Sequence, residues 1–537
     1  MSQRISRRDR ETLLGFNPDP TPQRPVPVHE LICHQALRTP DAIAVRSGGT
    51  VLTYRELLDA AALVAGRLAA DGVGPGAVVG LCAPRGAKLV VAVLGVLLSG
   101  AAYLPVDPQH PAHRQRAMLE SAHAALLLVD GAESPPDGHP TPVRSLAGAS
   151  IGGTGAPPAA PVDWRRYVAG SDVRDGLCCV IFTSGSTGEP KGVEVTHAGL
   201  ANRLVGMLDV HRVGPGDVLL HKTPYTFDVS MWELLLAFLA GGSLVVAPPQ
   251  AHRDPQALVE LIVRHGVTMV HFVPSMLALF VTEPDVGRCA SLRVVLCGGE
   301  ALPPKLVNTL TAVLPQASVY NMYGPAEATI DVTAWECRRP ELGDTVPIGR
   351  PLSNVSAYVV DEQGELVAPG VAGELLLGGA CLARGYAGRP EFTAERFVQT
   401  EVAGHRERVY RTGDLVRWSA EGYLDYLGRI DTQVKIRGQR VELGEIESTL
   451  RRHPLVDNAV VVLRDARSLV AYVVLAAGPR QEVDESALRA YLAERLPEHM
   501  VPSRIVGLAQ IPTTRHGKVD RAALPPPPRR RAAPVGR

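Results

Sequence analysis

One segment of the chain, residues 182–192 with the sequence FTSGSTGEPKG, has the groups that binding a phosphate requires. Glycines let backbone N–H groups approach a phosphate closely, hydroxyls add donors, and a lysine supplies positive charge. The segment differs from a Walker A motif, because Pro190 precedes Lys191 and Gly192 follows it. Its composition is also that of an ordinary surface loop, which stays the alternative. The candidate phosphate-binding residues are Thr183, Ser184, Gly185, Ser186, Thr187, Gly188 and Lys191.

A second polar cluster lies in residues 321–327, with the sequence NMYGPAE. The ring of Tyr323 could stack on a nucleotide base, and Asn321 could form a hydrogen bond with that base. Glu327 could hold a hard cation such as Mg²⁺, which prefers oxygen ligands. Gly324 and the following proline are equally typical of a plain turn with a surface glutamate. The segment is therefore a candidate nucleotide and metal site, with an ordinary turn as the alternative.

Three further segments carry charged side chains on expected turns. Asp414 ends the sequence YRTGD and could bind ribose hydroxyls, or simply belong to a tight turn. Residues 428–438, GRIDTQVKIRG, lie where the pattern of the chain changes. They suit a hinge that carries charges to a site, or an edge strand with solvated charges. Lys518, in residues 515–521, would by itself be read as an exposed lysine.

Length and composition limit the classes of protein to consider. A chain of 537 residues exceeds what one hydrophobic core usually serves, so at least two domains are expected. The formal net charge of zero argues against a nucleic-acid or membrane surface as partner. The eight cysteines include no C-x-x-C pair, which argues against zinc sites and a disulfide framework and favours a cytoplasmic location. Residues 1–10 lack the apolar core of a signal peptide.

Helical and strand patterns alternate along most of the chain, which predicts an α/β fold with layered subdomains and a largely parallel sheet. The most hydrophobic stretch, 89–106, is interrupted by glycine and proline and is expected to be a buried helix running into a strand. The expected helices cover 54–68, 87–98, 231–239, 255–265, 442–451 and 485–496. The expected strands cover 78–82, 242–247, 269–273, 294–297, 459–463 and 469–475.

Changes in pattern predict the domain organisation. We expect a long exposed loop at 131–162 and a small β-rich subdomain at 346–427. A boundary near 428–431 precedes a compact α+β domain of ordinary size. The predicted parts are a linker at 1–26, a core domain at 27–430, a small α+β domain at 431–524 and a disordered Pro/Arg tail at 525–537.

The order of these motifs and several others resembles the adenylate-forming superfamily, and within it the adenylation domains of nonribosomal peptide synthetases. The resemblance runs from about residue 28 to 524. The other segments that carry it are LTYREL at 52–57, GAAYLPVD at 100–107, FDVS at 227–230, GEL at 373–375, ARGY at 383–386 and LPEHMVP at 496–502. It implies a large N-terminal domain and a small, mobile C-terminal lid that rotates about Asp431.

The resemblance also implies two half reactions and assigns residues to them. An amino acid and MgATP form an aminoacyl-adenylate, which then passes to the phosphopantetheine thiol of a carrier domain. Cations must neutralise the charge that develops in the first step. The implied roles are substrate carboxylate and nucleotide contact for Lys518, Mg²⁺ binding for Glu327 and Thr183, ribose binding for Asp414, a second nucleotide contact for Arg429, and thioester formation for Lys435. Ala326 stands where the family usually has threonine, and His516 stands where it usually has asparagine. We expect these two differences to make the site less efficient at most.

The resemblance further implies an amino acid pocket, in which Asp228 pairs with the α-ammonium group. The pocket positions are Phe227, Asp228, Val229, Trp232, His271, Leu296, Gly298, Met322, Ile330 and Asp331. Most of them resemble serine-activating pockets, and His271 and Asp331 either bind a side-chain hydroxyl or are structural. Gly298 and Met322 are closer to threonine pockets, and the missing side chain at Gly298 leaves room for about one methyl group. The predicted substrate is serine, α-methylserine or threonine, since one methyl group discriminates by only ~1–3 kcal/mol.

Partners and alternatives follow from the same resemblance. A carrier domain, flanking synthetase domains and an MbtH-like protein are the expected partners in secondary metabolite or antibiotic biosynthesis. The chain has no carrier-domain signature, and residues 1–26 favour an excised part of a larger synthetase over a stand-alone enzyme. An acyl- or aryl-CoA ligase is one alternative, against which Asp228 argues. An inactive nucleotide-binding scaffold is another, against which the retained Lys518, Glu327, Asp414 and Lys191 argue.

Overall fold

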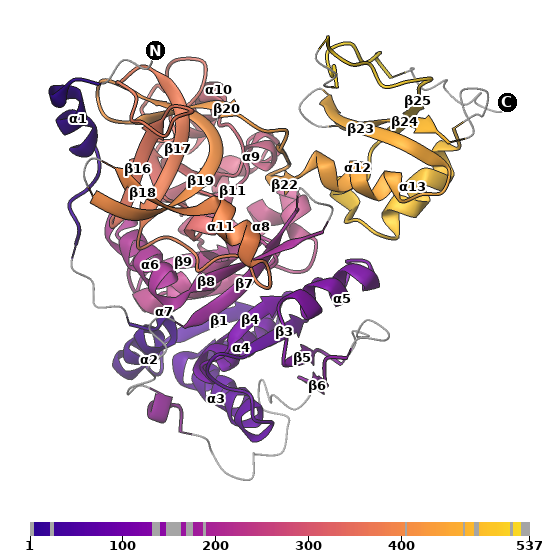
Figure 1. Ribbon diagram of the computed structural model, residues 1–537. Coiled ribbons are helices and arrows are strands. Elements are labelled where there is room, and N and C mark those ends of the chain that lie inside the picture. The colour runs from indigo at the N-terminus through magenta and orange to yellow at the C-terminus, as the bar shows by residue number, and fades with distance from the viewer. Residues whose placement is uncertain are drawn as a thin grey trace. The chain divides into compact units, whose positions relative to one another are not determined.

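The structure, a computed structural model, describes residues 5–21, 26–131, 140–146, 163–167, 176–185, 189–402, 405–464, 468–476, 483–515 and 519–527. The chain forms two compact units (Figure 1). The first unit comprises Met1–Gln109, Gln115–Thr183 and Lys191–Asp431. The second comprises His110–Arg114, Ser184–Pro190 and Thr432–Arg537.

A nine-stranded sheet lies at the centre of the first unit, in the order β15-β14-β13-β12-β11-β9-β10-β1-β2. The strands between β13 and β1 run parallel, and the strands at both edges run antiparallel. Their bounds are β1 Ile43–Ser47, β2 Thr50–Thr53, β9 Val218–His221, β10 Ser243–Val246, β11 Met269–Phe272, β12 Val294–Gly298, β13 Ser318–Tyr323, β14 Thr333–Glu336 and β15 Arg350–Pro351.

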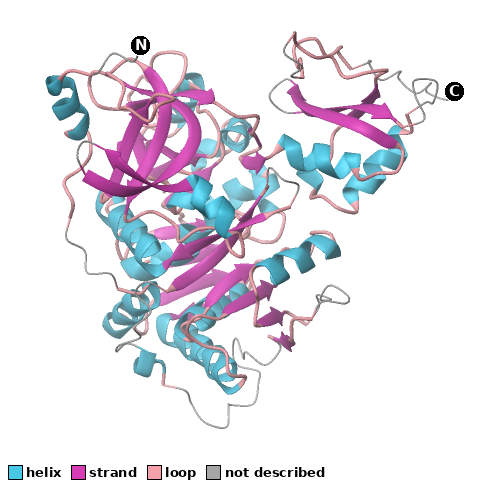
Figure 2. Cartoon of the chain, in the orientation of Figure 1, coloured by secondary structure: helices cyan, strands magenta, loops and turns pink. Residues whose placement is uncertain are grey.

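A six-stranded sheet is the second layer of this unit, in the order β6-β5-β3-β4-β7-β8. All neighbours are parallel except β7 and β8. The bounds are β3 Val78–Cys82, β4 Ala102–Pro105, β5 Leu126–Val129, β6 Val143–Ser145, β7 Leu177–Thr183 and β8 Lys191–Thr196. Helices and strands alternate along the unit (Figure 2), so the predicted α/β fold class is confirmed.

The helices of the first unit cover the faces of these sheets. Buried residues of α8, α9 and α10 pack on one face of the nine-stranded sheet. The other face shares a core cluster with α2, α3, α4, α6, α7 and the six-stranded sheet. The bounds are α2 Val28–Arg38, α3 Tyr54–Ala70, α4 Ala87–Leu98, α5 Ala112–Ser121, α6 His197–His211, α7 Ser230–Ala240, α8 Pro255–His265, α9 Pro274–Phe280, α10 Pro304–Val313 and α11 Pro390–Arg396.

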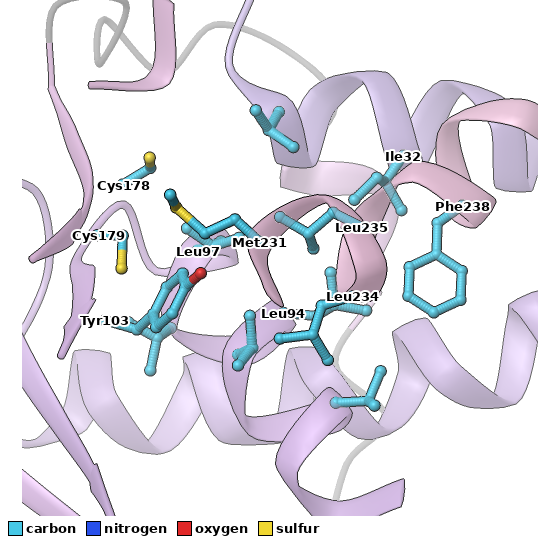
Figure 3. Packing of buried hydrophobic residues seen from close by; sticks show 14 of the residues in the cluster. Ile32, Leu94, Leu97, Tyr103, Cys178, Cys179, Met231, Leu234, Leu235 and Phe238 are labelled. Atoms are coloured by element: carbon cyan, nitrogen blue, oxygen red, sulfur yellow. The ribbon is translucent and has the colours of Figure 1, made fainter. Parts of the chain in front are cut away.

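The shared cluster is the largest core of the molecule, and Figure 3 shows part of it around Leu94, Met231, Leu235 and Phe238. Almost every residue of α4 is buried, and the helix leads into β4 as its hydrophobic pattern predicts. No helix in the described part of the chain is long and apolar enough to cross a membrane.

A five-stranded sheet of β16, β17, β19, β18 and β20 forms the β-rich subdomain that was expected at 346–427. Its strands are mainly antiparallel neighbours joined by turns, which explains the short apolar runs between turn residues. The bounds are β16 Val355–Val360, β17 Ala372–Gly379, β18 Phe397–Val402, β19 His405–Trp418 and β20 Leu424–Arg429.

The N-terminal segment corrects one expectation, because part of the proposed linker is α1, Arg7–Leu14. The Ser6 hydroxyl caps the helix by accepting a hydrogen bond from Asp9 N–H at 3.0 Å. Leu13 is buried, and the ring of Phe16 lies 5.1 Å from that of Trp418 on β19. The charged helix has too few apolar residues to show a clear period, and its core partner is far away in the sequence.

The structure also differs from the predicted loop at 131–162, because a short part of it is a strand. Val143–Ser145 forms β6, which pairs in parallel with β5. Three residues are too few to give a strand pattern, and the pairing partner supplies the order. Residues 132–139 and 147–162 lie outside the described residues.

The second unit contains a small α+β fold, as expected for the C-terminal part. A three-stranded sheet, β23-β24-β25, packs against α12 and α13, and β21 pairs with β22. The bounds are β21 Val434–Ile436, β22 Gln439–Val441, α12 Leu443–Arg451, β23 Val456–Arg464, β24 Ser468–Leu475, α13 Glu485–Ala493 and β25 Arg504–Gly507. Of the predicted tail, residues 528–537 lie outside the described part.

Candidate active site

Several candidate residues lie where parallel strands end. His271, Gly298 and Tyr323 are at or next to the last residues of β11, β12 and β13, and Thr183 is the last residue of β7. In open α/β sheets, ligands bind outside the carboxyl ends of the strands. The parallel order of β11, β12 and β13 therefore brings residues from distant segments to one edge.

The nucleotide candidates Tyr323, Asp414 and Arg429 form one buried network in the first unit. The Tyr323 hydroxyl donates to Asp414 Oδ2 at 2.5 Å, across 91 residues of sequence. Arg429 Nη1 donates to Asp414 Oδ1 at 2.9 Å. Burial and the neighbouring carboxylate raise the pKa of Tyr323 well above its ordinary value, so the phenol stays neutral and keeps its donor role. The sequence motifs predicted these residues, and the structure brings all three together.

Arg429 also bridges to the end of the first unit. Its Nε and Nη2 donate to the two carboxylate oxygens of Asp431 at 2.7 and 2.5 Å. Gly413 makes room for this contact, because a Cβ at that position would lie 2.9 Å from Arg429 Nη2 and 3.1 Å from Asp431 Oδ2. One guanidinium thus orients the predicted ribose residue and the predicted hinge residue.

Asn321 has a structural role in addition to the predicted one. Its amide nitrogen donates to the carbonyl oxygens of Pro347 at 2.8 Å and Val346 at 3.4 Å. The side-chain donor therefore fixes the segment that follows β14. Hydrogen bonding to a base stays a prediction.

Glu327, the predicted metal residue, is fully buried on the short helix Ala326–Ala328. The Tyr386 hydroxyl donates to its Oε1 at 2.7 Å. Lys191 is buried as well, and its Nζ lies 4.7 Å from the ring centre of Phe392 and 5.9 Å from that of Tyr386. Tyr386 belongs to the motif ARGY, to which the sequence assigns no role, and in the structure it contacts both candidates.

Glu327 and Thr183 have the oxygen groups that binding of Mg²⁺ requires. Thr183 Oγ1 is buried and has no hydrogen-bond partner among the described residues, and Glu327 supplies a carboxylate. Within the described ranges, no cluster of three or more His, Cys, Asp or Glu residues could hold a metal. Mg²⁺ typically binds through one or two protein oxygens together with substrate phosphates and water. The donor set therefore fits this ion, and substrate phosphates would complete its coordination.

The phosphate loop is described in part, within the second unit. The Ser184 hydroxyl donates to the Arg440 carbonyl oxygen at 2.9 Å and accepts from Glu442 N–H at 3.2 Å. Gly185 N–H donates to Glu445 Oε2 at 3.0 Å, so this amide already binds an anionic oxygen. Ser186, Thr187 and Gly188 lie outside the described residues.

Sequence reasoning missed the ion pair behind that contact. Glu445 Oε1 accepts from Arg114 Nη1 at 2.7 Å, and both side chains are buried. Of the two predicted catalytic lysines, Lys435 is a half-buried residue of β21, and Lys518 lies outside the described residues.

The predicted amino acid pocket is built on α7 and the ends of three strands. The Trp232 ring lies edge-on to His271 at 6.4 Å. Strand register places His271 beside Leu296 and Gly298 beside Met322. Phe227, Asp228 and Val229 precede α7, and Asp228 Oδ1 accepts from Val229 N–H at 2.8 Å.

His271 and Trp232 both bring buried ring nitrogens to this wall, and none of these nitrogens has a hydrogen-bond partner among the described residues; the two nitrogens of His271 matter most for the substrate prediction. The His271 side chain is buried. Burial, followed by the positive charge of Lys222, lowers the pKa of His271 to about 3. The ring is therefore neutral at pH 7 and can donate from one nitrogen and accept at the other. A Cβ on Gly298 would lie 3.5 Å from His271 Nε2 and 3.1 Å from the Met322 carbonyl oxygen.

A buried carboxylate that sequence reasoning missed lies close to this wall, on α7. Glu233 Oε2 accepts from the ring of His221 at 3.1 Å and from the backbone N–H groups of Lys222 and Thr223 at 3.0 and 2.9 Å. Burial raises the pKa of Glu233, but the His221 hydrogen bond and the Lys222 charge outweigh burial and lower the pKa to about 2. Glu233 therefore carries a negative charge that fixes the segment before the pocket loop.

The last pocket residues, Ile330 and Asp331, sit on a strained turn. Thr329 and Ile330 have φ values of 55° and 77°, which β-branched residues rarely adopt. The Thr329 hydroxyl donates to the Cys381 carbonyl oxygen at 2.7 Å, and Gly324 lets the turn approach, since its Cβ would overlap the Ile330 carbonyl oxygen.

Asp331 has a partner that the motifs did not indicate. Arg203 Nη2 on α6 donates to Asp331 Oδ2 at 3.2 Å, and only 5% and 9% of the two side chains is exposed. The arginine compensates the buried carboxylate and holds it in one place. A lone arginine within a helical pattern has no signal of its own, so structure alone reveals this pair.

The chain matches two family models and resembles known synthetases. Residues 32–387 match the family described as AMP-binding enzyme, and residues 445–518 match the AMP-binding enzyme C-terminal domain. Phosphinothricin tripeptide synthetase PhsB of Streptomyces viridochromogenes is 45% identical over 93% of this chain, which spans 42% of PhsB. Zwittermicin A synthase ZmaJ of Bacillus cereus is 38% identical over 93% of this chain and 94% of ZmaJ.

A solved structure shares the fold over nearly the whole length. It is that of holo-PA1221, an NRPS protein containing adenylation and PCP domains bound to vinylsulfonamide inhibitor. It has a TM-score of 0.79 and 28% identity, and covers 95% of this chain and 85% of its own.

Proposed function

The chain belongs to the AMP-binding enzyme family, and we propose that it activates serine, α-methylserine or threonine for nonribosomal peptide synthesis. It is an ATP-dependent adenylate-forming ligase of the nonribosomal peptide synthetase adenylation type. The observation that carries the substrate class is His271, a buried neutral imidazole with no hydrogen-bond partner among the described residues, beside Gly298, which has no side chain. A substrate hydroxyl would satisfy a nitrogen of that ring, and an added methyl group is proposed to lie beside Gly298, where a side chain would crowd it.

In the first half reaction, a carboxylate oxygen of the amino acid attacks the α-phosphorus of ATP. A new O–P bond forms, the bond from the α-phosphorus to the bridging oxygen breaks, and pyrophosphate leaves. Both reactants are anions, so the site must supply positive charge. Lys191 and Lys518 are proposed for this role, and Asp228 for the α-ammonium group. When bound, Mg²⁺ neutralises phosphate charge, and Glu327 and Thr183 would hold it.

Nucleotide binding is assigned to the buried network of the first unit. Asp414 would bind the ribose hydroxyls, with its carboxylate oriented by Tyr323 and Arg429. Tyr323 would also stack on the base, near Asn321. Arg429 already neutralises the Asp414 carboxylate, so nucleotide binding would require no rearrangement of the charges in this network.

In the second half reaction, the phosphopantetheine thiol of a carrier domain attacks the acyl carbonyl carbon. A C–S bond forms, the bond between the acyl carbon and the phosphate oxygen breaks, AMP leaves with that oxygen, and the thiol proton is released to solvent. Lys435 is proposed to act in this step after the C-terminal unit rotates about Asp431, the last residue of the first unit. Flanking synthetase domains and an MbtH-like protein are the proposed partners, and the cytoplasm the proposed location.

Amino-acid-dependent ATP–pyrophosphate exchange tests the proposal, using serine, α-methylserine, threonine, alanine and benzoate. Hydroxylated amino acids should exceed alanine, because alanine would leave the buried imidazole without a partner. Equal turnover of alanine and serine would contradict the role of His271. If no substrate works, repeating the panel with an MbtH-like protein separates a missing partner from a wrong pocket.

Two further assays separate the alternatives. Transfer to free coenzyme A with a benzoate or fatty acid substrate would favour an acyl- or aryl-CoA ligase. Lys518→Ala should abolish adenylate formation while ATP binding stays detectable, whereas an inactive scaffold would show no adenylate in either chain. Exchange that survives in Lys518→Ala would contradict the catalytic assignment.

A further inference from the structure

The segment ARGY at 383–386 lies against Glu327 and against the strand that carries Lys191. Its last residue, Tyr386, is only 5% exposed, and its hydroxyl donates to Oε1 of the fully buried Glu327 at 2.7 Å. A hydrogen bond to a carboxylate is stronger than one between neutral groups, because the acceptor is charged. The tyrosine therefore restricts the orientation of the carboxylate proposed to bind Mg²⁺.

Tyr386 is itself held from several sides. Its backbone N–H donates to Thr393 Oγ1 at 2.9 Å, and its ring lies edge-on to Phe397 at 5.7 Å. The neighbouring Gly385 permits this contact with α11, since a Cβ at that position would lie 2.5 Å from the Thr393 methyl carbon. These contacts restrict the orientation of the Tyr386 side chain. A side chain that orients another must itself be held in place.

The same segment is joined to the strand that carries Lys191. Glu194 N–H donates to the Gly385 carbonyl oxygen at 3.0 Å, and Ala387 N–H donates to the Gly192 carbonyl oxygen at 2.8 Å. The Lys191 ammonium lies 5.9 Å from the centre of the Tyr386 ring. A cation within about 6 Å of an aromatic face is attracted to it. One tyrosine thus contacts the proposed metal carboxylate through its hydroxyl and the proposed phosphate lysine through its ring.

We propose that Tyr386 is a positioning residue that presents the Glu327 carboxylate to the divalent cation and keeps Lys191 beside it. The proposal rests on the proposed function, in which Glu327 binds Mg²⁺. A phenylalanine at this position would keep the ring near Lys191 and remove the hydroxyl that donates to Glu327. The two contacts can therefore be tested separately.

The test compares Tyr386→Phe with Tyr358→Phe, a control in which the same change removes a hydroxyl that donates to Glu407 Oε2 at 2.7 Å in the five-stranded sheet. The readout is calorimetric binding of α,β-methylene-ATP at increasing Mg²⁺, which needs no turnover. We expect Tyr386→Phe to raise the Mg²⁺ concentration for half-maximal binding by about tenfold, since hydrogen bonds to charged groups are the strong class. Tyr358→Phe should match the wild type.

The route of the effect is tested in a Glu327→Gln background. There, Tyr386→Phe should cause no further shift in Mg²⁺ dependence, because the carboxylate through which it acts is gone. An equal further shift would overturn the proposal. Thr393→Val removes the acceptor of the Tyr386 backbone N–H and should cause a smaller shift in Mg²⁺ dependence in the same direction. If Tyr386→Phe does not fold, this variant tests the positioning role in its place.

The outcomes separate this inference from the proposed function. If the wild type binds the analogue equally well with and without Mg²⁺, the assignment of Glu327 fails and the positioning role fails with it. If the wild type needs Mg²⁺ but Tyr386→Phe behaves like Tyr358→Phe, only the positioning role is overturned.

Discussion

At the scale of single residues, the pocket depends on a missing side chain. A Cβ added to Gly298 would lie 3.5 Å from His271 Nε2 and 3.1 Å from the Met322 carbonyl oxygen. Gly298→Ala should therefore reduce exchange with α-methylserine or threonine by about tenfold more than exchange with serine, as expected for loss of space for one methyl group. The ratio of kcat/KM values for these substrates in one preparation is the measurement, with serine as internal control. An unchanged ratio would show that the extra methyl group lies elsewhere.

A second residue-scale prediction concerns the charge pair beneath the pocket. Arg203→Met would leave the Asp331 carboxylate buried without its arginine, and should lower the free energy of unfolding by about 3–5 kcal/mol. Asp331→Asn added to Arg203→Met should restore much of the loss, because the carboxylate charge that lost its arginine is removed. Urea unfolding followed by circular dichroism measures both.

The control for this pair is Arg7→Met, which breaks the exposed pair with Glu11. Exposed pairs contribute little, so a change below about 1 kcal/mol is expected there. If Arg203→Met were as stable as the control, Asp331 would be compensated by other groups and the arginine would not be its anchor.

At the scale of elements, α3 and α4 approach so closely that one glycine decides the packing. A Cβ on Gly95 of α4 would lie 2.5 Å from Val64 Cβ and 2.8 Å from the Ala61 carbonyl oxygen on α3. Gly95→Ala should destabilise the chain by about 1–3 kcal/mol through overpacking. Gly206→Ala on α6 is the matched control, since no atom lies within 4 Å of its added Cβ. There the lower backbone entropy of alanine should stabilise the helix by about 0.5–1 kcal/mol, and thermal unfolding distinguishes the two signs.

The elements also show what sequence can and cannot predict. Apolar patterns located α3, α4, α8 and the parallel strands β3, β10, β11 and β12, because burial of a repeated apolar face needs no knowledge of the partner. The helix α1 and the strand β6 were missed, since Phe16 and Val143 acquire their order from Trp418 and from β5, far away in the chain.

The same division holds for the site. Motifs predicted Tyr323, Asp414 and Arg429, and the structure joins them in one network. Arg203 and Glu233 compensate buried groups of the pocket region from the helices α6 and α7. In the sequence, a single charged residue within a helical pattern cannot be distinguished from a surface residue. Their function is a matter of tertiary contact, which local pattern does not encode.

At the scale of the whole molecule, buried histidines couple stability to pH. Burial lowers the pKa of His29 to about 4, and of His197, His211 and His271 to about 3. The ordinary pKa of histidine is 6.5. Below that pH the unfolded chain binds protons at these rings, whereas the folded chain does not. Stability is then fully present above pH 6.5 and is lost as the pH falls from 6.5 towards the folded values.

Replacing one of these rings should reduce that loss by a calculable amount. His211 packs edge-on to Tyr320 at 4.6 Å, its ring nitrogens have no hydrogen-bond partner among the described residues, and burial, Arg203 and Arg293 together lower its pKa. His211→Phe keeps an aromatic ring there and removes the titrating group. The decline in unfolding free energy between about pH 6 and pH 4.5 should become shallower by up to about 1.4 kcal/mol per pH unit. Carboxylates titrate in both chains and cancel in the difference, so identical slopes would mean that His211 is protonated in the folded chain.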